Sequence, residues 1–337
     1  MSPSPLAASV VGASGYAGAE VVALLADHPV FEIGSLVSRT YSEQPFSDLY
    51  PACSGKIDNS FEPLEYEKIA EVDVVFLAVP HTTSMQIVPE LRRINPSLNI
   101  VDLAADYRFN SVSKFEEVYG VKHNDPQNVS EAVYGLSEYN KDDIKAASLV
   151  ANPGCYATAA LVPMIALGKE NLLGDTVFVD AKSGISGAGR GPSEATSFVN
   201  CNNQIKPYKV GSHRHQPEIL EHTPGSENIS LRFVPHTIPA DRGIEAAIYF
   251  TPPEDGLDKI ENILVNLADK NSLFRYRKNP AGIKAVANTP FCDLNVHCDE
   301  KTAVVFSCID NLQKGAASQA IQNANLISGL NMNLGLE

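Results

Sequence analysis

One of the six cysteines stands in a sequence context that suits a nucleophile. Cys155 lies in the pentapeptide NPGCY, which follows the apolar run 148–151 and precedes another, 157–167, whose composition favours a helix. A strand, a tight turn at Pro153-Gly154 and a helix would place the thiol at a helix N-terminus, where unpaired N–H groups and the dipole favour the reactive thiolate. The position alone also fits a structural cysteine, because cysteine is among the most buried residue types.

A second cluster of reactive side chains lies in the sequence HRHQPE, residues 213–218. Two histidines two positions apart could ligate a metal, but no further ligand follows at a suitable spacing, so acid–base chemistry beside a thiol is the better interpretation. On an extended segment alternate side chains point to the same side, so the spacing does not choose between His213 and His215. Polar groups also occur in the glycine-rich segment 182–190 and in the segment 235–243. These segments could contribute to an active site or be loops without a catalytic role.

The composition indicates an ordinary globular protein. The chain has 337 residues, enough for two domains, and a net charge of −14 without a run of Lys or Arg, which argues against a nucleic-acid surface. It has no window of about 18 apolar residues and no basic segment leading into an apolar stretch, so we expect a cytoplasmic protein without a membrane span. The cysteines lack tight spacing and are expected to be reduced. Cys292, His297 and Cys298 offer no paired ligand spacing, so no metal site is predicted.

The N-terminal part predicts a nucleotide-binding turn. An apolar strand at 9–12 leads into GASGYAG, residues 12–18, and then into a helical run at 19–26. Glycines in such a turn let the backbone approach a pyrophosphate, which the helix N-terminus attracts. The spacing is G-x-x-G-x-x-G rather than G-x-G-x-x-G, so a simple strand–helix turn fits as well as a cofactor site.

The end of the second strand bears on the choice of cofactor. Residues 31–37 predict this strand, and Ser38-Arg39-Thr40 follow where an acidic residue would hold the ribose 2′-hydroxyl of NAD. A guanidinium with neighbouring hydroxyls instead suits the 2′-phosphate of NADP, because Arg engages phosphate bidentately. A solvated loop arginine is the alternative.

The two halves of the chain predict different sheets. In the first half, strands at 72–79 and 99–103 and a helix at 84–93 continue a doubly wound parallel sheet, whose carboxyl edge would carry residues 106–108. The second half predicts a mostly antiparallel sheet. No neighbouring segment is an obvious packing partner for the last helix, so this helix could pack against the first domain. The second half is expected to contain strands at 176–181, 229–234, 245–250 and 302–308 and helices at 155–168, 256–269 and 314–328.

Taken together, eight stretches resemble N-acetyl-γ-glutamyl-phosphate reductases of arginine biosynthesis, over nearly the whole chain. The joint presence of NPGCY and HRHxPEI is the most specific feature. The sequence departs from the family pattern at Ala104 and Tyr107, where Ser and Phe are common, and at Ser137, where Pro is common. The stretches are GASGYAGAE (12–20), DLAADYR (102–108), YGLSE (134–138), NPGCYAT (152–158), SGISGAGR (183–190), HRHQPEI (213–219), FVPHTIPADRGI (233–244) and DNLQKGAASQAIQN (310–323).

The resemblance implies a two-domain α/β fold. An NADP-binding Rossmann domain with a doubly wound parallel sheet would comprise 1–154 plus 311–337, with the last helix rejoining it. An α+β catalytic and dimerisation domain with a mixed or antiparallel sheet would comprise 155–310. The implied reaction is the NADPH-dependent reduction of N-acetyl-glutamyl phosphate, with release of phosphate. A homo-oligomer, dimer or tetramer, is implied; neither nucleic acid nor membrane is an expected partner.

The resemblance also implies roles for individual residues. Cys155 would form a thioester, His215 would be the acid–base group with His213 second, and Glu218 would orient an imidazole or the substrate. The residues implied in substrate binding are Arg108, for the phosphate, Ser183 and Arg190. Those implied in cofactor binding are Gly12, Ser14, Gly15, Tyr16, Gly18, Ser38, Arg39, Gly184, Gly187 and Asn311.

Two alternatives remain open at this point. An aspartate-β-semialdehyde dehydrogenase would share the cofactor and the nucleophile and would differ in substrate. A non-catalytic dinucleotide-sensing protein would keep the glycine-rich turn but have a structural, slowly reacting Cys155. A papain-like hydrolase is disfavoured because it would leave the glycine-rich turn without a purpose.

Overall fold

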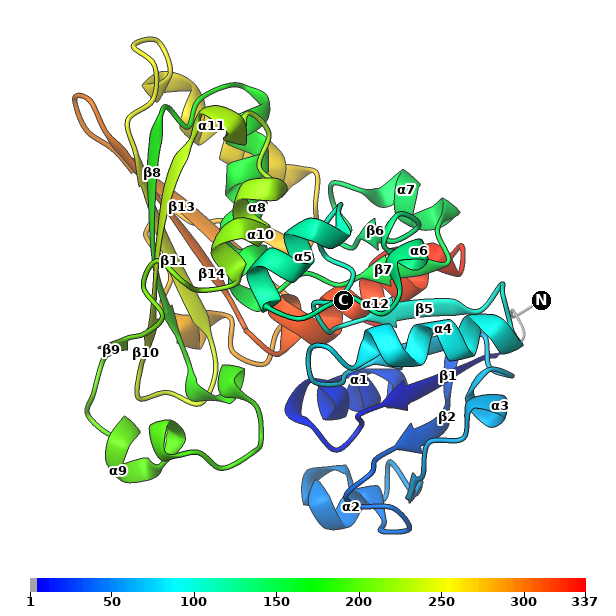
Figure 1. Cartoon of the computed structure of the whole chain (residues 1–337). Helices are drawn as coiled ribbons and strands as arrows, with labels where there is room; N and C mark the ends of the chain where they lie inside the picture. Colours follow the sequence, from blue (N-terminus) through cyan, green and yellow to red (C-terminus); the bar gives the residue numbers. More distant parts are fainter. Residues whose placement is uncertain (1–4) are drawn as a thin grey trace. The chain divides into compact units, whose positions relative to one another are not determined.

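The computed structural model describes residues 5–337, and the chain forms two compact units, each with its own sheet (Figure 1). The first unit runs up to Pro153 and resumes over Ala316–Glu337, and the second comprises Gly154–Gly315. The expected return to the first domain is at residue 311. In the structure 311–315 stay with the second unit, because their polar contacts lie within it, as described below.

The first unit confirms the predicted doubly wound parallel sheet. Its seven strands lie in the order β3-β2-β1-β4-β5-β7-β6, and all neighbours are parallel. The central strand β4, with the sequence VVFL, is apolar and buried throughout, as expected of a parallel strand covered by helices. The strands are β1 Leu6–Val11, β2 Phe31–Val37, β3 Phe61–Glu62, β4 Val74–Leu77, β5 Asn99–Asp102, β6 Val133–Tyr134 and β7 Leu149–Ala151. The helices are α1 Tyr16–Ala26, α2 Phe46–Leu49, α3 Tyr66–Ile69, α4 Ser84–Ile94, α5 Val112–Tyr119, α6 Pro126–Val129 and α7 Lys141–Ala146, with a 3₁₀ turn at Pro51–Cys53.

The last helix belongs to the first unit, which confirms the predicted return of the chain. A π-helical turn, Gln313–Ala317, leads into α12, Ser318–Ile327, which contacts α1, α7 and β5. Every residue of α12 is buried, although half of them are polar. Buried polar groups need hydrogen-bond partners, so this helix must be held by specific side-chain contacts.

The second unit contains a mixed seven-stranded sheet in the order β12-β13-β14-β11-β8-β10-β9. The pairs β8–β10 and β12–β13 are parallel and the others antiparallel. Two short helices, α9 and α10, were not predicted. The strands are β8 Thr176–Ser183, β9 Lys206–Pro207, β10 Ser230–Thr237, β11 Ile244–Phe250, β12 Phe274–Tyr276, β13 Cys292–Cys298 and β14 Ala303–Ile309. The helices are α8 Cys155–Lys169, α9 Phe198–Cys201, α10 His215–Glu221 and α11 Leu257–Asp269, with 3₁₀ turns at 185–188, 194–196, 226–228 and 283–285.

Helices α8, α10 and α11 pack on one face of this sheet (Figure 1). Helix α8 is apolar on all sides and buried from Tyr156 to Ile165, so it forms the centre of the unit's core. Strand residues alternate between the two faces. On the face away from these helices, which we call the outer face, Phe178 and Tyr249 are 51% and 44% exposed.

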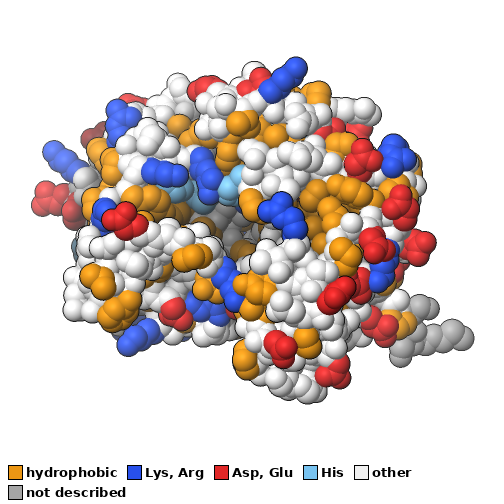
Figure 2. Space-filling view, turned by 60° about the horizontal axis from the view of Figure 1, so that its bottom comes forward, with side chains coloured by type: hydrophobic (Ala, Val, Ile, Leu, Met, Phe, Trp, Pro, Cys, Tyr) orange, Lys and Arg blue, Asp and Glu red, His pale blue; other side chains and the backbone are white. Residues whose placement is uncertain are grey.

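The surface carries charges of both signs. On the face drawn in Figure 2, acidic side chains lie interspersed with Lys and Arg rather than in one cluster. Within residues 5–337, no helix has the length and apolar character needed to span a bilayer.

Candidate active site

Cys155 is the first residue of α8, as predicted. The preceding strand β7 ends at Ala151, and Gly154, in extended conformation, is the N-cap of the helix. The first turn of α8 contains no acidic residue, and Cys155 is partly exposed. The thiol therefore lies at the positive end of a fifteen-residue helix, where the dipole favours a thiolate.

Two glycines make room around this cysteine. A Cβ on Gly154 would lie 2.4 Å from Nε2 of His215, so glycine lets this imidazole contact the turn that carries the thiol. A Cβ on Gly315 would lie 2.8 Å from the Cβ of Cys155. Neither glycine was predicted to have a role, because each role depends on the close approach of a residue distant in sequence.

The histidine segment is helical rather than extended, which corrects the expectation behind the His213–His215 comparison. Helix α10 begins at His215, and Nδ1 of His213 accepts a hydrogen bond from the His215 N–H at 3.1 Å. Pro217 fits because it is the third helical residue, whose missing N–H would have no intrahelical partner. The two histidines therefore have different structural roles. His213 precedes the helix and accepts the first helical N–H through its side chain, and His215 is the first residue of the helix.

The two imidazoles lie in an aromatic environment. The rings of His213 and His215 are 4.8 Å apart, and both contact the ring of Tyr156 at 5.7 and 5.9 Å. Phe233 and Tyr208 pack against His213. Burial, together with the positive charges of Arg214 and Lys209, lowers the pKa of His213 to about 3. His213 is therefore neutral at working pH, and because its Nδ1 accepts a hydrogen bond, its proton lies on Nε2.

Glu218 is buried and holds the nucleophile turn. Its Oε1 accepts a hydrogen bond from the N–H of Gly154 at 2.8 Å. This contact ties α10 to the residue before Cys155. The role expected of Glu218 was to orient an imidazole or the substrate; the contact found here is with the main chain of the turn.

Tyr156 links the nucleophile helix to the sheet. Its hydroxyl donates to the main-chain oxygen of His236 at 3.0 Å, and the Tyr208 hydroxyl donates to it at 3.4 Å. Burial raises the pKa of both tyrosines, so they remain neutral hydrogen-bonding groups. Nδ1 of His236 lies 3.1 Å from Oδ1 of Asp180. Neither Tyr156 nor Tyr208 was predicted, although Tyr156 adjoins Cys155 in the sequence.

The glycine-rich loop after β8 is tied to neighbouring loops. The N–H groups of Gly184, Ile185 and Ser186 donate to the main-chain oxygens of residues 243, 240 and 241. The Asn311 amide accepts from the N–H of Gly243 at 2.7 Å and donates to the Ser186 hydroxyl at 2.9 Å. These bonds explain why residue 311 stays with the second unit.

The glycines of this loop differ in their surroundings. A Cβ on Gly184 would lie 2.6 Å from the main-chain nitrogen of Arg242, so glycine is required there for loop packing. Gly187 and Arg190 are more accessible. The Ser183 hydroxyl donates to the main-chain oxygen of Gly184 at 3.0 Å.

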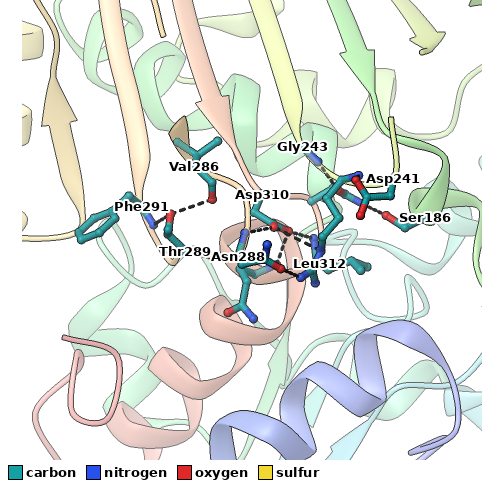
Figure 3. Close-up of polar contacts among 12 residues, drawn as sticks. Ser186, Asp241, Gly243, Val286, Asn288, Thr289, Phe291, Asp310 and Leu312 are labelled. Carbon is teal, nitrogen blue, oxygen red and sulfur yellow. Dashed lines mark hydrogen bonds and ion pairs between the residues drawn. The ribbon is translucent and has the colours of Figure 1, made fainter. Parts of the chain in front are cut away.

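Asp310 braces the same loops (Figure 3). Its carboxylate accepts hydrogen bonds from the N–H groups of Leu312, Gln313 and Asn288 and lies 3.4 Å from Nε of Arg242. The carboxylate is fully buried. Asp310, the first residue of the run DNLQKG, thus organises main chain at the end of β14.

The predicted nucleotide-binding turn in the first unit has the required close contacts. Gly12 has φ +87°, and a Cβ there would lie 2.3 Å from the oxygen of Ala78. A Cβ on Gly18 would lie 2.3 Å from the oxygen of Gly12, so the helix can pack on the strand only with glycine at this position. The turn is therefore as tight as a dinucleotide-binding turn needs to be.

The surroundings of this turn fit an anionic cofactor. The first turn of α1 contains no acidic residue, and its N–H groups have no intrahelical partner. The hydroxyls of Ser14 and Ser38 lie 2.8 Å apart, which brings the turn to the end of β2. Tyr16 and Arg39 are exposed. The turn before α1 and the residues directly after β2 thus offer hydrogen-bond donors to a phosphate-bearing nucleotide and contain no acidic residue.

Arg108 is buried at the carboxyl edge of the parallel sheet. Its Nε donates to the main-chain oxygen of Asn152 at 2.8 Å and its Nη2 to that of Leu103 at 2.9 Å. Tyr107, a departure from the family pattern, donates its hydroxyl to Asp125 at 2.7 Å. The guanidinium is therefore held in place by main chain from the ends of β5 and β7.

The described residues contain no group of three or more His, Cys, Asp or Glu side chains that could hold a metal ion.

Two family models match the chain along these units. The semialdehyde dehydrogenase NAD-binding domain matches residues 7–147, and the semialdehyde dehydrogenase dimerisation domain matches residues 155–311. With the fold and the site, they define an enzyme of the semialdehyde dehydrogenase class that uses a nicotinamide cofactor. An aspartate semialdehyde dehydrogenase II of Vibrio cholerae shares the fold, with a TM-score of 0.73 at 14% identity, covering 96% of this chain and 99% of that one. An aspartate semialdehyde dehydrogenase of Candida albicans with NADP has a TM-score of 0.67 at 16% identity, covering 98% and 100%.

Curated relatives identify the family more closely. The N-acetyl-gamma-glutamyl-phosphate reductase of Halothermothrix orenii is 40% identical over 98% of this chain and 97% of its own length. Those of Desulforapulum autotrophicum and Methanosarcina barkeri are each 39% identical with the same coverage. The chain belongs to the N-acetyl-gamma-glutamyl-phosphate reductase family, which confirms the resemblance seen in the sequence.

Proposed function

We propose that this enzyme reduces N-acetyl-glutamyl 5-phosphate to N-acetyl-glutamate 5-semialdehyde with NADPH, through a thioester on Cys155, in arginine biosynthesis. The observation that carries the proposal is a partly exposed cysteine at the N-terminus of α8 with the His215 imidazole packed against the preceding glycine. The names of relatives at about 40% identity over nearly the full chain support the substrate.

Cys155 supplies the nucleophile. Its thiolate attacks the acyl carbon, and phosphate leaves with the electron pair of the C–O bond, so a thioester forms. NADPH, when bound, supplies the hydride that reduces the thioester. Sulfur suits both steps, because a thiolate is a strong nucleophile and also leaves readily when the hemiacetal collapses.

His215 is the proposed acid–base group. It donates a proton to the oxyanion of the hemiacetal and takes it back as the C–S bond breaks, which releases the aldehyde and regenerates the thiolate. Its Nε2 faces the glycine next to Cys155, whereas His213 uses Nδ1 to cap the helix. Glu218 is a positioning residue that fixes the turn through the Gly154 N–H.

Substrate and cofactor roles follow the family pattern. Arg108 is proposed to bind the substrate phosphate, with Ser183 and Arg190 as further substrate contacts. The turn at Gly12, Ser14, Gly15, Tyr16 and Gly18 would hold the cofactor phosphates at the N-terminus of α1. Gly184, Gly187 and Asn311 are proposed cofactor contacts; the Asn311 amide also bonds Gly243 and Ser186, so it fixes the loop that would meet the cofactor.

The reaction run backwards tests the proposal as a whole. The purified enzyme should reduce NADP when given N-acetyl-glutamate semialdehyde and inorganic phosphate, and the rate should depend on phosphate. Aspartate semialdehyde is the matched control substrate. Faster turnover of aspartate semialdehyde would assign the chain to the other acyl-phosphate reductase, and no turnover with either would remove the catalytic proposal.

We expect a preference for NADP over NAD that depends on Arg39. The guanidinium is exposed after β2, beside Ser38, and no acidic residue directly follows this strand in the sequence Ser38-Arg39-Thr40. Arg39→Ala should weaken NADP binding by roughly ten- to a hundredfold, the scale of a lost charged hydrogen-bonding pair, and leave NAD binding nearly unchanged. Equal kcat/KM for both cofactors in the unmutated enzyme would contradict the assignment.

We also propose that the enzyme is a homo-oligomer that assembles through the second unit. The outer face of its sheet exposes Phe178 and Tyr249, and the family model that matches this unit is named for dimerisation. Burial of this apolar surface would favour association. Light scattering coupled to size exclusion measures the mass, and a monomer at micromolar concentration would contradict the proposal.

A further inference from the structure

The core of the first unit contains a network of side-chain amides that the proposed mechanism does not use. We call it the amide network; its members are Ser137, Asn152, Gln319 and Asn323. The Asn323 Nδ2 group donates to the main-chain oxygen of Gly135 and to Oδ1 of Asn152, both at 2.9 Å. All members are at least 99% buried. The network therefore joins α12 to the start of the NPGCY turn.

The orientation of each amide in this network is determined. The Ser137 hydroxyl donates its proton to Oδ1 of Asn323 at 2.7 Å and accepts from Nε2 of Gln319 at 2.5 Å. The Nδ2 group of Asn323 then points at the Gly135 oxygen and at the Asn152 side chain. Because Nδ2 is a donor, Asn152 must turn its acceptor, Oδ1, toward Asn323. Its Nδ2 donates to the oxygen of Ala316 at 3.2 Å. A flipped Asn323 would set oxygen against oxygen, which makes this arrangement unique.

The network accounts for the residue types at two positions of the YGLSE motif, Gly135 and Ser137. A Cβ on Gly135 would lie 2.4 Å from Nδ2 of Asn323, so only glycine admits the amide. Ser137 is the departure from the family pattern, where Pro is common. Proline has no hydroxyl, so in this chain the serine adds a donor that orients Asn323.

The network ends on Arg108. The N–H of Asn152 donates to the main-chain oxygen of Asp102 at 2.8 Å, and the Asn152 side chain is held in the network. The oxygen of Asn152 accepts the Nε of Arg108 at 2.8 Å. We propose that Asn323, oriented by Ser137, is a positioning residue that sets the guanidinium of Arg108 for substrate phosphate through Asn152. This inference rests on the proposed phosphate-binding role of Arg108.

The test compares two asparagines of the same helix. Asn325 is also buried and also donates two Nδ2 hydrogen bonds to acceptors, the main-chain oxygens of Met332 and Leu334, but these lie in the C-terminal segment. Asn323→Ala should raise the KM for inorganic phosphate in the reverse reaction by about tenfold, within the range of coupling in one hydrogen-bond network. The kcat and the KM for NADP should stay within about twofold. Both variants lose a buried amide and should lower the melting temperature by similar amounts. Asn325→Ala, however, should leave the KM for phosphate unchanged.

A double-mutant cycle with Arg108→Ala identifies the route. If Asn323 acts through Arg108, the effect of Asn323→Ala on the phosphate KM should disappear when Arg108 is already alanine. Additive effects, or equal effects of Asn323→Ala and Asn325→Ala, would overturn the inference. If Arg108→Ala leaves the phosphate KM unchanged, the proposed role of Arg108 fails first and the inference fails with it.

A milder variant covers the case in which Asn323→Ala does not fold. Ser137→Ala removes the donor to Asn323 and the acceptor of Gln319 but keeps the Asn323 side chain, and it should raise the phosphate KM by a smaller factor. An unchanged phosphate KM in a folded Ser137→Ala enzyme would exclude the orienting role of the serine.

Discussion

Cys155→Ser should lower kcat by at least roughly a thousandfold while leaving NADPH binding intact, because the serine alkoxide is far harder to form near pH 7 than a thiolate. The helix N-terminus that favours the thiolate would remain, so the loss reports on the nucleophile itself. Steady-state assays measure kcat, and fluorescence titration with NADPH measures binding. A serine variant that kept a tenth of wild-type turnover would show that Cys155 is not the nucleophile.

Cys201 provides the control for this experiment. It is also partly exposed, but it ends the short helix α9, and its thiol faces the oxygen of Ala195. Cys201→Ser should retain full activity. In iodoacetamide labelling at neutral pH, Cys155 should react faster than Cys201, whereas a dinucleotide-sensing protein with a structural Cys155 should show the opposite order.

His215→Asn should lower kcat by roughly a hundredfold or more, the usual scale for losing a positioned proton donor. The imidazole packs against Gly154, so its Nε2 is next to the residue that precedes the nucleophile. A role only in substrate positioning would instead raise KM with kcat nearly unchanged. The pH profile of kcat, measured for both enzymes, should lose one limb in the variant.

His213 distinguishes proton transfer from helix capping. An asparagine at 213 can accept the N–H two residues ahead, as His213 Nδ1 does, whereas leucine cannot. His213→Asn should therefore be mild and His213→Leu more severe. Because burial holds the pKa of His213 at about 3, neither variant should change the shape of the profile above pH 5. If His213→Asn were worse than His215→Asn, the two roles would have to be exchanged.

The sequence predicted those parts of the fold that depend on local pattern. The strand at 31–37 coincides with β2, in which apolar residues predominate and only Glu32 is exposed. The cysteine position was predicted because apolar runs on either side of Pro-Gly fit a strand, a turn and a helix. The alternation of strands and helices likewise predicted the parallel sheet.

Other features depend on partners far along the chain, which spacing does not reveal. The helix at His215 was missed because Pro217 argues against a helix unless it falls in the first turn. The Asn311 amide bonds groups 68 and 125 residues away, and Glu218 meets Gly154 at a separation of 64. The amide network spans 171 residues between Asn152 and Asn323. The sequence singled out Glu218 and Asn311 as site residues, but it could not predict which distant groups they contact.

The burial of α8 on all sides has a consequence for how the enzyme loses its activity. The helix that carries Cys155 lies at the centre of the second unit's core, so its hydrogen-bonded amide protons beyond the first turn should exchange with solvent only when that unit opens as a whole. The nucleophile is thus mounted on the slowest-exchanging part of the unit rather than on a mobile loop. On heating, the geometry at the thiol should persist until the unit melts, and any earlier loss of turnover would arise in the more exposed loops.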